Sequence, residues 1–198
     1  MNNLTVGFAL CGSFCTFSDV ISEMRYMSEK GYKIIPIMSF NAFQTDTRFG
    51  KAQEHIRKIE DICGRKIIAT LPDAEPIGPQ KMLDILVIEP CTGNTLAKLA
   101  NGITDTPVTL AAKSHLRNSR PLLIAVSTND ALSGSAKNIG KLMNMKNIFF
   151  VPFSQDNPDN KPGSMISDFK KTEEAVKKAI NNEQIQPIIN NHFSPSDY

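Results

Sequence analysis

The sequence Asp84-Ile-Leu-Val-Ile-Glu89 is the clearest strand in the chain, because the residues between its two acidic ends are all apolar. An uninterrupted apolar run of this length is typical of a strand in a parallel sheet that is covered on both faces. A loop, Pro90-Cys-Thr-Gly-Asn-Thr95, follows at once and leads into a predicted helix over about residues 95–101. A buried strand followed by a loop and a helix is the building unit of an α/β fold.

Similar units occur on both sides of this one. Further strands are predicted at residues 4–10, 33–38, 66–69, 121–126 and 147–151, and further helices at about 16–30, 48–63, 135–143 and 167–181. Residues 71–80 contain three prolines and are expected to form a loop. The alternation predicts a Rossmann-like, three-layer, doubly wound parallel sheet. We expect a single domain over residues 1–186 and a loose C-terminal tail over 187–198.

The composition is that of an ordinary globular domain. The chain has 198 residues, of which 41% are hydrophobic and 21% charged, and its net charge is +2. This charge is too small to indicate binding to nucleic acid or to an anionic membrane surface. No apolar run is long enough to span a bilayer, and Met1-Asn2-Asn3 lacks the basic region of a signal peptide, so a cytoplasmic location is expected.

The four cysteines give no sign of a metal site or a redox pair. Cys11, Cys15, Cys63 and Cys91 form no CxxC motif, and no histidine lies at ligand spacing from them. We expect reduced, mostly buried thiols and no bound metal.

Four loops at the carboxyl ends of the predicted strands are rich in hydroxyl, amide and small side chains. They cover residues 11–15, 39–43, 90–95 and 127–132. Ligands of open parallel sheets bind at this edge, and backbone N–H groups at helix N-termini suit a phosphate. Gly7, Gly12 and Ser13 do not form the GxGxxG fingerprint of dinucleotide sites, so we expect a single phosphate at the Gly12–Ser13 turn.

No acid and base are paired in the sequence. Asp105, Asp130 and His115 are candidates for proton transfer, although capping or solvated roles are more common for such residues. His55 falls on the charged face of the helix predicted over residues 48–63, and we expect it to be exposed.

A specific motif follows the central strand: Pro90-Cys-Thr-Gly-Asn-Thr-Leu-Ala-Lys-Leu-Ala-Asn-Gly102, continued by Ile103-Thr-Asp105. It resembles the signature loop and helix of the flavin-dependent cysteine decarboxylase superfamily, which includes phosphopantothenoylcysteine decarboxylases and flavin prenyltransferases. Gly12-Ser13 is similar to the phosphate-side turn of that superfamily, and Ser39-Phe-Asn-Ala42 to its second-strand loop. The resemblance covers roughly residues 4–152.

The resemblance implies a flavoprotein fold, flavin mononucleotide (FMN) as the cofactor, and trimers or dodecamers of the chain. Phe43, Phe49 and Met82 are apolar residues near loops and are candidates for contacts between subunits, with burial inside the monomer as the alternative. It assigns no catalytic residue. The residues that it places around the cofactor are Gly12, Ser13, Phe14, Ser39, Phe40, Asn41, Pro90, Cys91, Thr92, Asn94, Thr95, Ser127 and Asn129.

Within the superfamily, Thr45-Asp-Thr-Arg-Phe-Gly50, Glu75-Pro-Ile-Gly-Pro79 and the overall length are most similar to an oxidising branch. This likeness implies one component of an oxidoreductase that converts dihydrodipicolinate to dipicolinate with a dinucleotide-binding A subunit, in the mother cell of a sporulating bacterium. The decarboxylases carry a histidine where this chain has Pro76-Ile-Gly-Pro-Gln80, and their asparagine motif survives only as Ser127-Thr-Asn129.

Three functions therefore remain open: an electron-handling enzyme subunit, a non-catalytic partner or scaffold of the A subunit, and an FMN-dependent decarboxylase of a small acid. Lys113, Arg117 and Arg120 are candidates for binding the carboxylates of a small dicarboxylate substrate, with a solvated cationic helix face as the alternative.

Overall fold

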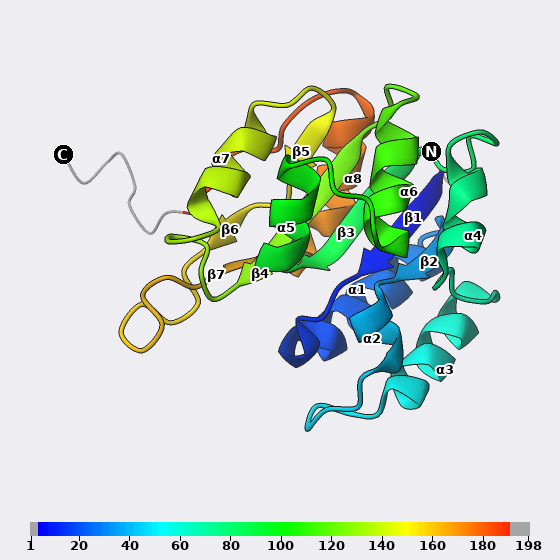
Figure 1. Ribbon diagram of the computed structural model, residues 1–198, viewed down its shortest axis with the longest axis horizontal. Coiled ribbons are helices and arrows are strands. Elements are labelled where there is room, and N and C mark those ends of the chain that lie inside the picture. The colour runs from blue at the N-terminus through cyan, green and yellow to red at the C-terminus, as the bar shows by residue number, and fades with distance from the viewer. Residues whose placement is uncertain (1–3, 191–198) are drawn as a thin grey trace.

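The computed structural model describes residues 4–190 and contains a central sheet with helices on both faces (Figure 1). Along the sheet the strands follow the order β2-β1-β3-β4-β7-β6, and β5 also pairs with β4. Their bounds are β1 (Thr5–Leu10), β2 (Lys33–Met38), β3 (Ile85–Cys91), β4 (Leu122–Thr128), β5 (Ile148–Phe150), β6 (Phe153–Ser154) and β7 (Met165–Ser167).

Strands β1 to β5 are parallel, as the alternating pattern predicts. Gly7 of β1 aligns with Ile35 of β2 and with Leu86 of β3, and Leu123 of β4 aligns with Phe149 of β5. The doubly wound α/β class is therefore confirmed. A small antiparallel hairpin, β6 and β7, extends the sheet beside β4 and was not predicted. Its strands have two and three residues, too few for a period-2 pattern to be visible in the sequence.

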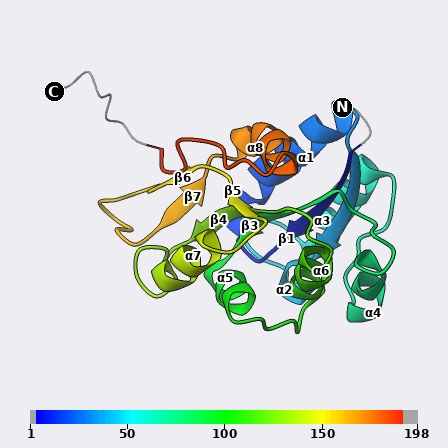
Figure 2. The same ribbon diagram turned by 90° about the horizontal axis from the view of Figure 1, so that it is seen from above.

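The helices form two layers, one on each face of the sheet (Figure 2). Each layer packs a separate apolar core against the sheet. One core packs β1 and β3 against α1 (Phe17–Glu29), α3 (Ala52–Cys63) and α8 (Thr172–Ile180). The other packs β3 and β4 against α5 (Gly93–Ala100), α6 (Pro107–Leu116) and α7 (Ala136–Met143). Burial of apolar side chains on both faces explains why the central strands have no polar alternation.

Several predicted boundaries are wrong for local reasons. Helix α3 begins at Ala52, not near residue 48, because the Asp46 carboxylate accepts a hydrogen bond from the Ala52 N–H at 2.8 Å and residues 48–50 form a turn. Helix α8 begins at Thr172, because residues 165–167 pair as β7 and a 3-10 turn, η3 (Phe169–Lys171), follows.

Some other segments contain helices that were not predicted, and one predicted strand is nearly absent. The proline-rich stretch contains α4 (Leu71–Ala74) and η2 (Glu75–Ile77), and a short helix, α2 (Phe40–Gln44), follows β2. Helix α6 was missed, although the side chains of Thr106 and Thr109 form a capping box at its start. The strand expected at residues 66–69 is reduced to an isolated bridge between Ile37 and Ile68.

The first residues of the expected loose tail pair with the sheet. Ile189 forms a parallel bridge with Phe153, and the Asn190 N–H donates to the Phe153 carbonyl at 3.1 Å. Residues 187–190 therefore continue the edge of the sheet, and the rest of the predicted tail lies outside the described residues.

Among the described residues, no helix combines the length and the apolar character needed to cross a membrane.

Candidate cofactor site

A cavity of about 370 Å³ lies at the carboxyl ends of β1, β2 and β3. Its walls come from the loops after these three strands and from the connection between α5 and α6. The residues that line it are Cys11, Gly12, Ser39, Phe40, Asn41, Thr92, Asn94, Thr95, Lys98, Asp105 and Thr106. It is therefore at the sheet edge where open α/β folds bind ligands.

Helix caps hold three hydroxyl side chains at this cavity. Ser39 caps α2 by accepting from the Ala42 N–H at 3.3 Å, and Thr92 caps α5 by accepting from the Thr95 N–H at 3.4 Å. Thr106 caps α6 in the same way. Because the first N–H groups of a helix have no intrahelical partner, the N-terminus of α5 presents donors and a partial positive charge toward the cavity.

Cys11 joins two of the contributing loops. Its backbone N–H donates to the Pro90 carbonyl at 3.2 Å, and its thiol accepts a hydrogen bond from the Thr95 hydroxyl at 3.2 Å. Burial raises the pKa of the Cys11 thiol to about 11, so the group is neutral near pH 7. Cys11 and Cys91 are buried, as expected for structural thiols, whereas Cys63 is half-buried and Cys15 is exposed.

Lys98 and Asp105 supply the charges at the cavity and are paired with each other. The Lys98 ammonium lies 2.8 Å from one Asp105 oxygen and 2.9 Å from the other. The hydrogen bond from Lys98 lowers the pKa of the Asp105 carboxyl, so Asp105 is an ionised counter-ion and not an acid ready to donate a proton.

Seven of the thirteen residues predicted at the cofactor line this cavity: Gly12, Ser39, Phe40, Asn41, Thr92, Asn94 and Thr95. The other six are Ser13, Phe14, Pro90, Cys91, Ser127 and Asn129, and they lie outside its lining. Ser13 is close by, with its hydroxyl 2.8 Å from that of Ser127, whereas Phe14 lines a neighbouring cavity of about 410 Å³ with Cys15 and His55. Cofactor contact by all thirteen residues stays a prediction.

The β4–α7 loop supports the N-terminus of α5 at Gly93. A Cβ atom at Gly93 would lie 2.6 Å from an Asp130 carboxylate oxygen and 2.6 Å from the Ser135 hydroxyl, so no larger residue fits. Asp130 accepts hydrogen bonds from the hydroxyls of Thr128 at 2.6 Å and Ser135 at 2.9 Å. Asp130 therefore braces this loop through side-chain hydroxyls, and it does not line the cavity.

The histidines of the described chain are not placed for proton transfer in this cavity. His115 is buried and its Nε2 lies 2.9 Å from the Pro121 carbonyl, at the amino end of β4. Burial lowers the pKa of His115 to about 4, which keeps the ring neutral. The expectation that His55 is exposed is wrong, because its ring is buried edge-on against Phe17 with centroids 5.1 Å apart.

The three cations considered for a dicarboxylate lie at the opposite edge of the sheet. Lys113 and Arg117 belong to the end of α6, and Arg120 precedes β4 by two residues. The Arg120 guanidinium donates to the Leu83 carbonyl and lies 3.6 Å from Asp84. The dicarboxylate hypothesis for these three residues is therefore wrong with respect to this cavity, since the carboxyl ends of the strands form the other edge.

The flavoprotein family model matches residues 1–186. The chain belongs to the flavoprotein family. It is 43% identical over 192 residues to the B subunit of dipicolinate synthase from Bacillus subtilis (strain 168), an alignment that covers 97% of this chain and 96% of the relative.

Two solved structures show the same architecture. The B subunit of dipicolinate synthase from Bacillus halodurans C is 42% identical, with a TM-score of 0.87 and coverage of 96% of this chain and 97% of that one. The FMN-dependent cysteine decarboxylase SpaF is 22% identical, with a TM-score of 0.64 and coverage of 90% and 95%, and shares the fold.

Sequence reasoning missed Lys98 and Thr106 as cavity residues, placed Cys11 in a ligand loop without assigning it to the cofactor, and considered Asp105 only as a possible acid or base. Lys98 is part of the helix that follows the signature loop, and helical periodicity indicates the direction in which it faces. It lies three and four residues after Thr95 and Asn94, on the face of α5 that these residues turn toward the cavity.

Proposed function

We propose that this flavoprotein-family chain binds FMN in the cavity at the carboxyl ends of β1, β2 and β3. We propose further that, with a dinucleotide-binding A subunit, it oxidises dihydrodipicolinate to dipicolinate during sporulation. The observation that carries the proposal is this polar cavity, formed by the signature loop in a chain 43% identical to the B subunit of dipicolinate synthase. Dihydrodipicolinate, the substrate that would be oxidised, is a small ring with two carboxylates. Its oxidation needs a flat cofactor that accepts electrons, and the part of the protein is to hold that cofactor in position.

The donor set supports a mononucleotide. The Gly12–Ser13 turn, where the single phosphate is predicted, lies at the same cavity as the N-terminal N–H groups of α5 next to Thr92, which add donors for it. The amides of Asn41 and Asn94 suit the polar edge of a ring. Gly12 leaves room at the wall, since a Cβ there would meet only Phe14 at 3.5 Å and Asn41 at 3.8 Å. A side chain at this position would extend into space that the ligand needs.

The cavity residues hold and orient rather than transfer protons. Lys98 is neutralised by Asp105, and the Cys11 thiol is neutral and hydrogen-bonded to Thr95. A bound flavin would supply the two-electron acceptor. The A subunit would then contribute the proton-transfer groups and the pyridine nucleotide, because the Gly12–Ser13 turn lacks the dinucleotide fingerprint. A cavity whose charged groups are paired and whose thiol is neutral also fits the scaffold alternative, in which the chain binds the A subunit without handling electrons.

The test measures flavin first and activity second. The chain, expressed alone, is heated, and the supernatant is analysed for FMN by fluorescence and chromatography. We expect about one FMN per chain, greatly reduced retention in Gly12→Leu, and weaker retention in Asn94→Ala. The exposed Asn144, which caps the end of α7, gives the matched control Asn144→Ala.

Coupled activity then separates the two roles. With the A subunit present, dihydrodipicolinate should be converted to dipicolinate, and Gly12→Leu should lose this activity while remaining folded by circular dichroism. Full activity of both cavity variants would contradict the enzyme proposal and favour the scaffold.

A further inference from the structure

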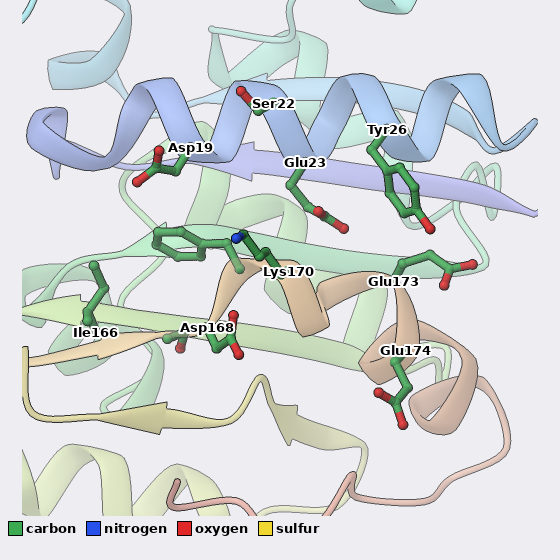
Figure 3. Close-up of a pocket in the computed structure, with 11 residues that line it drawn as sticks. Asp19, Ser22, Glu23, Tyr26, Ile166, Asp168, Lys170, Glu173 and Glu174 are labelled. Atoms are coloured by element: carbon green, nitrogen blue, oxygen red, sulfur yellow. The ribbon is translucent and has the colours of Figure 1, made fainter.

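A larger cavity, far from the signature loop in sequence, lies between α1 and the η3–α8 segment. Its volume is about 690 Å³, within the range of small-molecule sites. Figure 3 shows side chains from both segments directed into the space between them. The residues that line this acidic cavity are Asp19, Ser22, Glu23, Tyr26, Ile166, Ser167, Asp168, Phe169, Lys170, Glu173 and Glu174.

The charge of the acidic cavity is strongly one-sided. Five of its lining residues are acidic, and Lys170 is the basic residue among them. Glu173 is already paired, with Lys177 at 2.6 Å and with the Tyr32 hydroxyl at 2.9 Å. In the described part of the chain, the ion pairs do not include Asp19, Glu23 or Asp168. Like charges gathered in a recess focus a negative potential and attract cations.

Glu23 gives an independent sign of a ligand. Its side chain projects from α1 into the acidic cavity (Figure 3), and the residue is only 7% exposed. One carboxyl oxygen, Oε1, is buried and has no hydrogen-bond partner. A buried carboxylate without a partner is costly, and most buried polar groups in proteins are satisfied. The Glu89 carboxyl of β3 faces Glu23 and also has an unpartnered buried oxygen, so it cannot compensate the charge of Glu23, whereas an ammonium group bound in the cavity would do so.

The acidic cavity also has apolar walls. Phe169 and Ile166 line it together with the carboxylates, and the Tyr26 ring projects into it from α1 (Figure 3). Lys30 lies over the Tyr26 ring with its ammonium 5.3 Å from the centroid, so this ring already accepts a cation–π contact. A lining that combines carboxylates with apolar side chains suits a cation with charges spaced along a methylene chain.

We propose that the acidic cavity is a binding site for a linear aliphatic polyamine, with one ammonium group at the Glu23 carboxyl, a second at Asp19 or Asp168, and the methylene chain against Phe169. The site is separate from the proposed cofactor cavity, so this inference does not depend on the proposed function.

The test is isothermal titration of the full-length chain at pH 8 and 150 mM salt, with spermidine as the probe. We expect saturable binding of one spermidine per chain. Glu23→Gln should weaken binding at least tenfold, and Asp168→Asn should weaken it to a smaller extent. Glu29→Gln, which removes the same charge from an exposed position on the same helix outside the lining, should leave the affinity unchanged. Thermal melting confirms that each variant is folded.

Two further probes decide what the acidic cavity recognises. A neutral diol of matched length should not bind, and Mg²⁺ at equal ionic strength should not displace spermidine. Equal displacement by Mg²⁺ would overturn the proposal, because the cavity would then respond to charge alone. A lysine-rich peptide that binds through Glu23 while spermidine does not would also overturn it, because the site would then belong to a protein partner.

Discussion

The hydroxyl groups of Ser13 and Ser127 lie 2.8 Å apart, although 114 positions separate the two residues in the chain. Ser13 follows β1 and Ser127 belongs to the end of β4, so the contact passes over the carboxyl end of β3, where the signature loop begins. The two loops that flank the signature loop are thus joined directly, which fixes the edge of the sheet around the proposed cofactor site.

A double-mutant cycle measures this contact. We expect Ser13→Ala and Ser127→Ala each to lower the free energy of unfolding by about 1 kcal/mol, since a side-chain hydrogen bond contributes about that much. The double variant should lose less than the sum, with a coupling energy of about 0.5–1 kcal/mol in urea denaturation. A coupling energy within error of zero would show that the two hydroxyls do not interact in solution.

Gly93 should be irreplaceable for steric reasons. A Cβ at this position would lie 2.6 Å from the Asp130 carboxylate, which Thr128 and Ser135 hold in place through hydrogen bonds. We expect Gly93→Ala to destabilise the chain by about 1–3 kcal/mol, the usual range for overpacking. Gly140→Ala is the control, because no atom lies within 4 Å of a Cβ there. It should be neutral or stabilise α7 by up to about 1 kcal/mol.

The sequence predicted the parallel part of the fold well, because β1, β3 and β4 are buried on both faces and their apolar runs are unmistakable. The strand-end rule then placed Gly12, Ser39 and Thr92 at one edge, and the structure brings them to one cavity.

The remaining elements depend on contacts between residues far apart in the chain. His55 has the helical position of a surface residue, yet the turn at residues 48–50 and the ring of Phe17 bury it. Helix α6 has small and apolar residues around most of its circumference, so it shows no clear helical periodicity in the sequence. Strands β6 and β7 are too short for any periodicity to reveal them. Lys98 is the exception, because its place three and four residues after Thr95 and Asn94 on α5 could have been inferred from helical periodicity.

Exposed apolar side chains predict self-association of the chain. Phe49 is 45% exposed beside Arg48, whose guanidinium lies 4.8 Å from the ring centroid, whereas Phe43 and Met82 are partly buried against the two cores. Exposed aromatic and arginine side chains are enriched at protein interfaces. We expect light scattering to show trimers or dodecamers at micromolar concentration, and Phe49→Glu to shift them toward monomers. Met145→Glu, at another exposed apolar residue, is the control, and a monomeric wild-type chain would contradict the prediction.

The stability of the chain should depend on pH through Glu23. Burial raises the pKa of Glu23 from its ordinary value of 4.5 to about 7, and the carboxylates of Glu173 and Asp168 act in the same direction. The groups that face it are Glu89 from β3, Asp168, Lys170 and Glu173 from the η3–α8 segment, and Asp19 and Tyr26 from its own helix. Because the folded chain holds this proton more tightly than the unfolded chain, the stabilisation is complete below pH 4.5 and is lost as the pH rises to about 7.

Glu23→Gln removes this titration without changing the size of the side chain. We therefore expect the variant to be more stable than the wild-type chain by about 1–3 kcal/mol at pH 8, since one pKa unit corresponds to about 1.4 kcal/mol. At pH 4.5 the difference should be small, because the carboxyl is protonated in the folded chain and the amide replaces a neutral group. Urea denaturation at both pH values gives the comparison, with Glu29→Gln as the control for loss of an exposed charge on α1. A constant difference between the two pH values would show that Glu23 titrates normally.

Spermidine at saturating concentration should make the wild-type chain more stable than Glu23→Gln at pH 8. The ligand stabilises the ionised carboxylate of the wild-type chain, and the amide cannot replace that carboxylate.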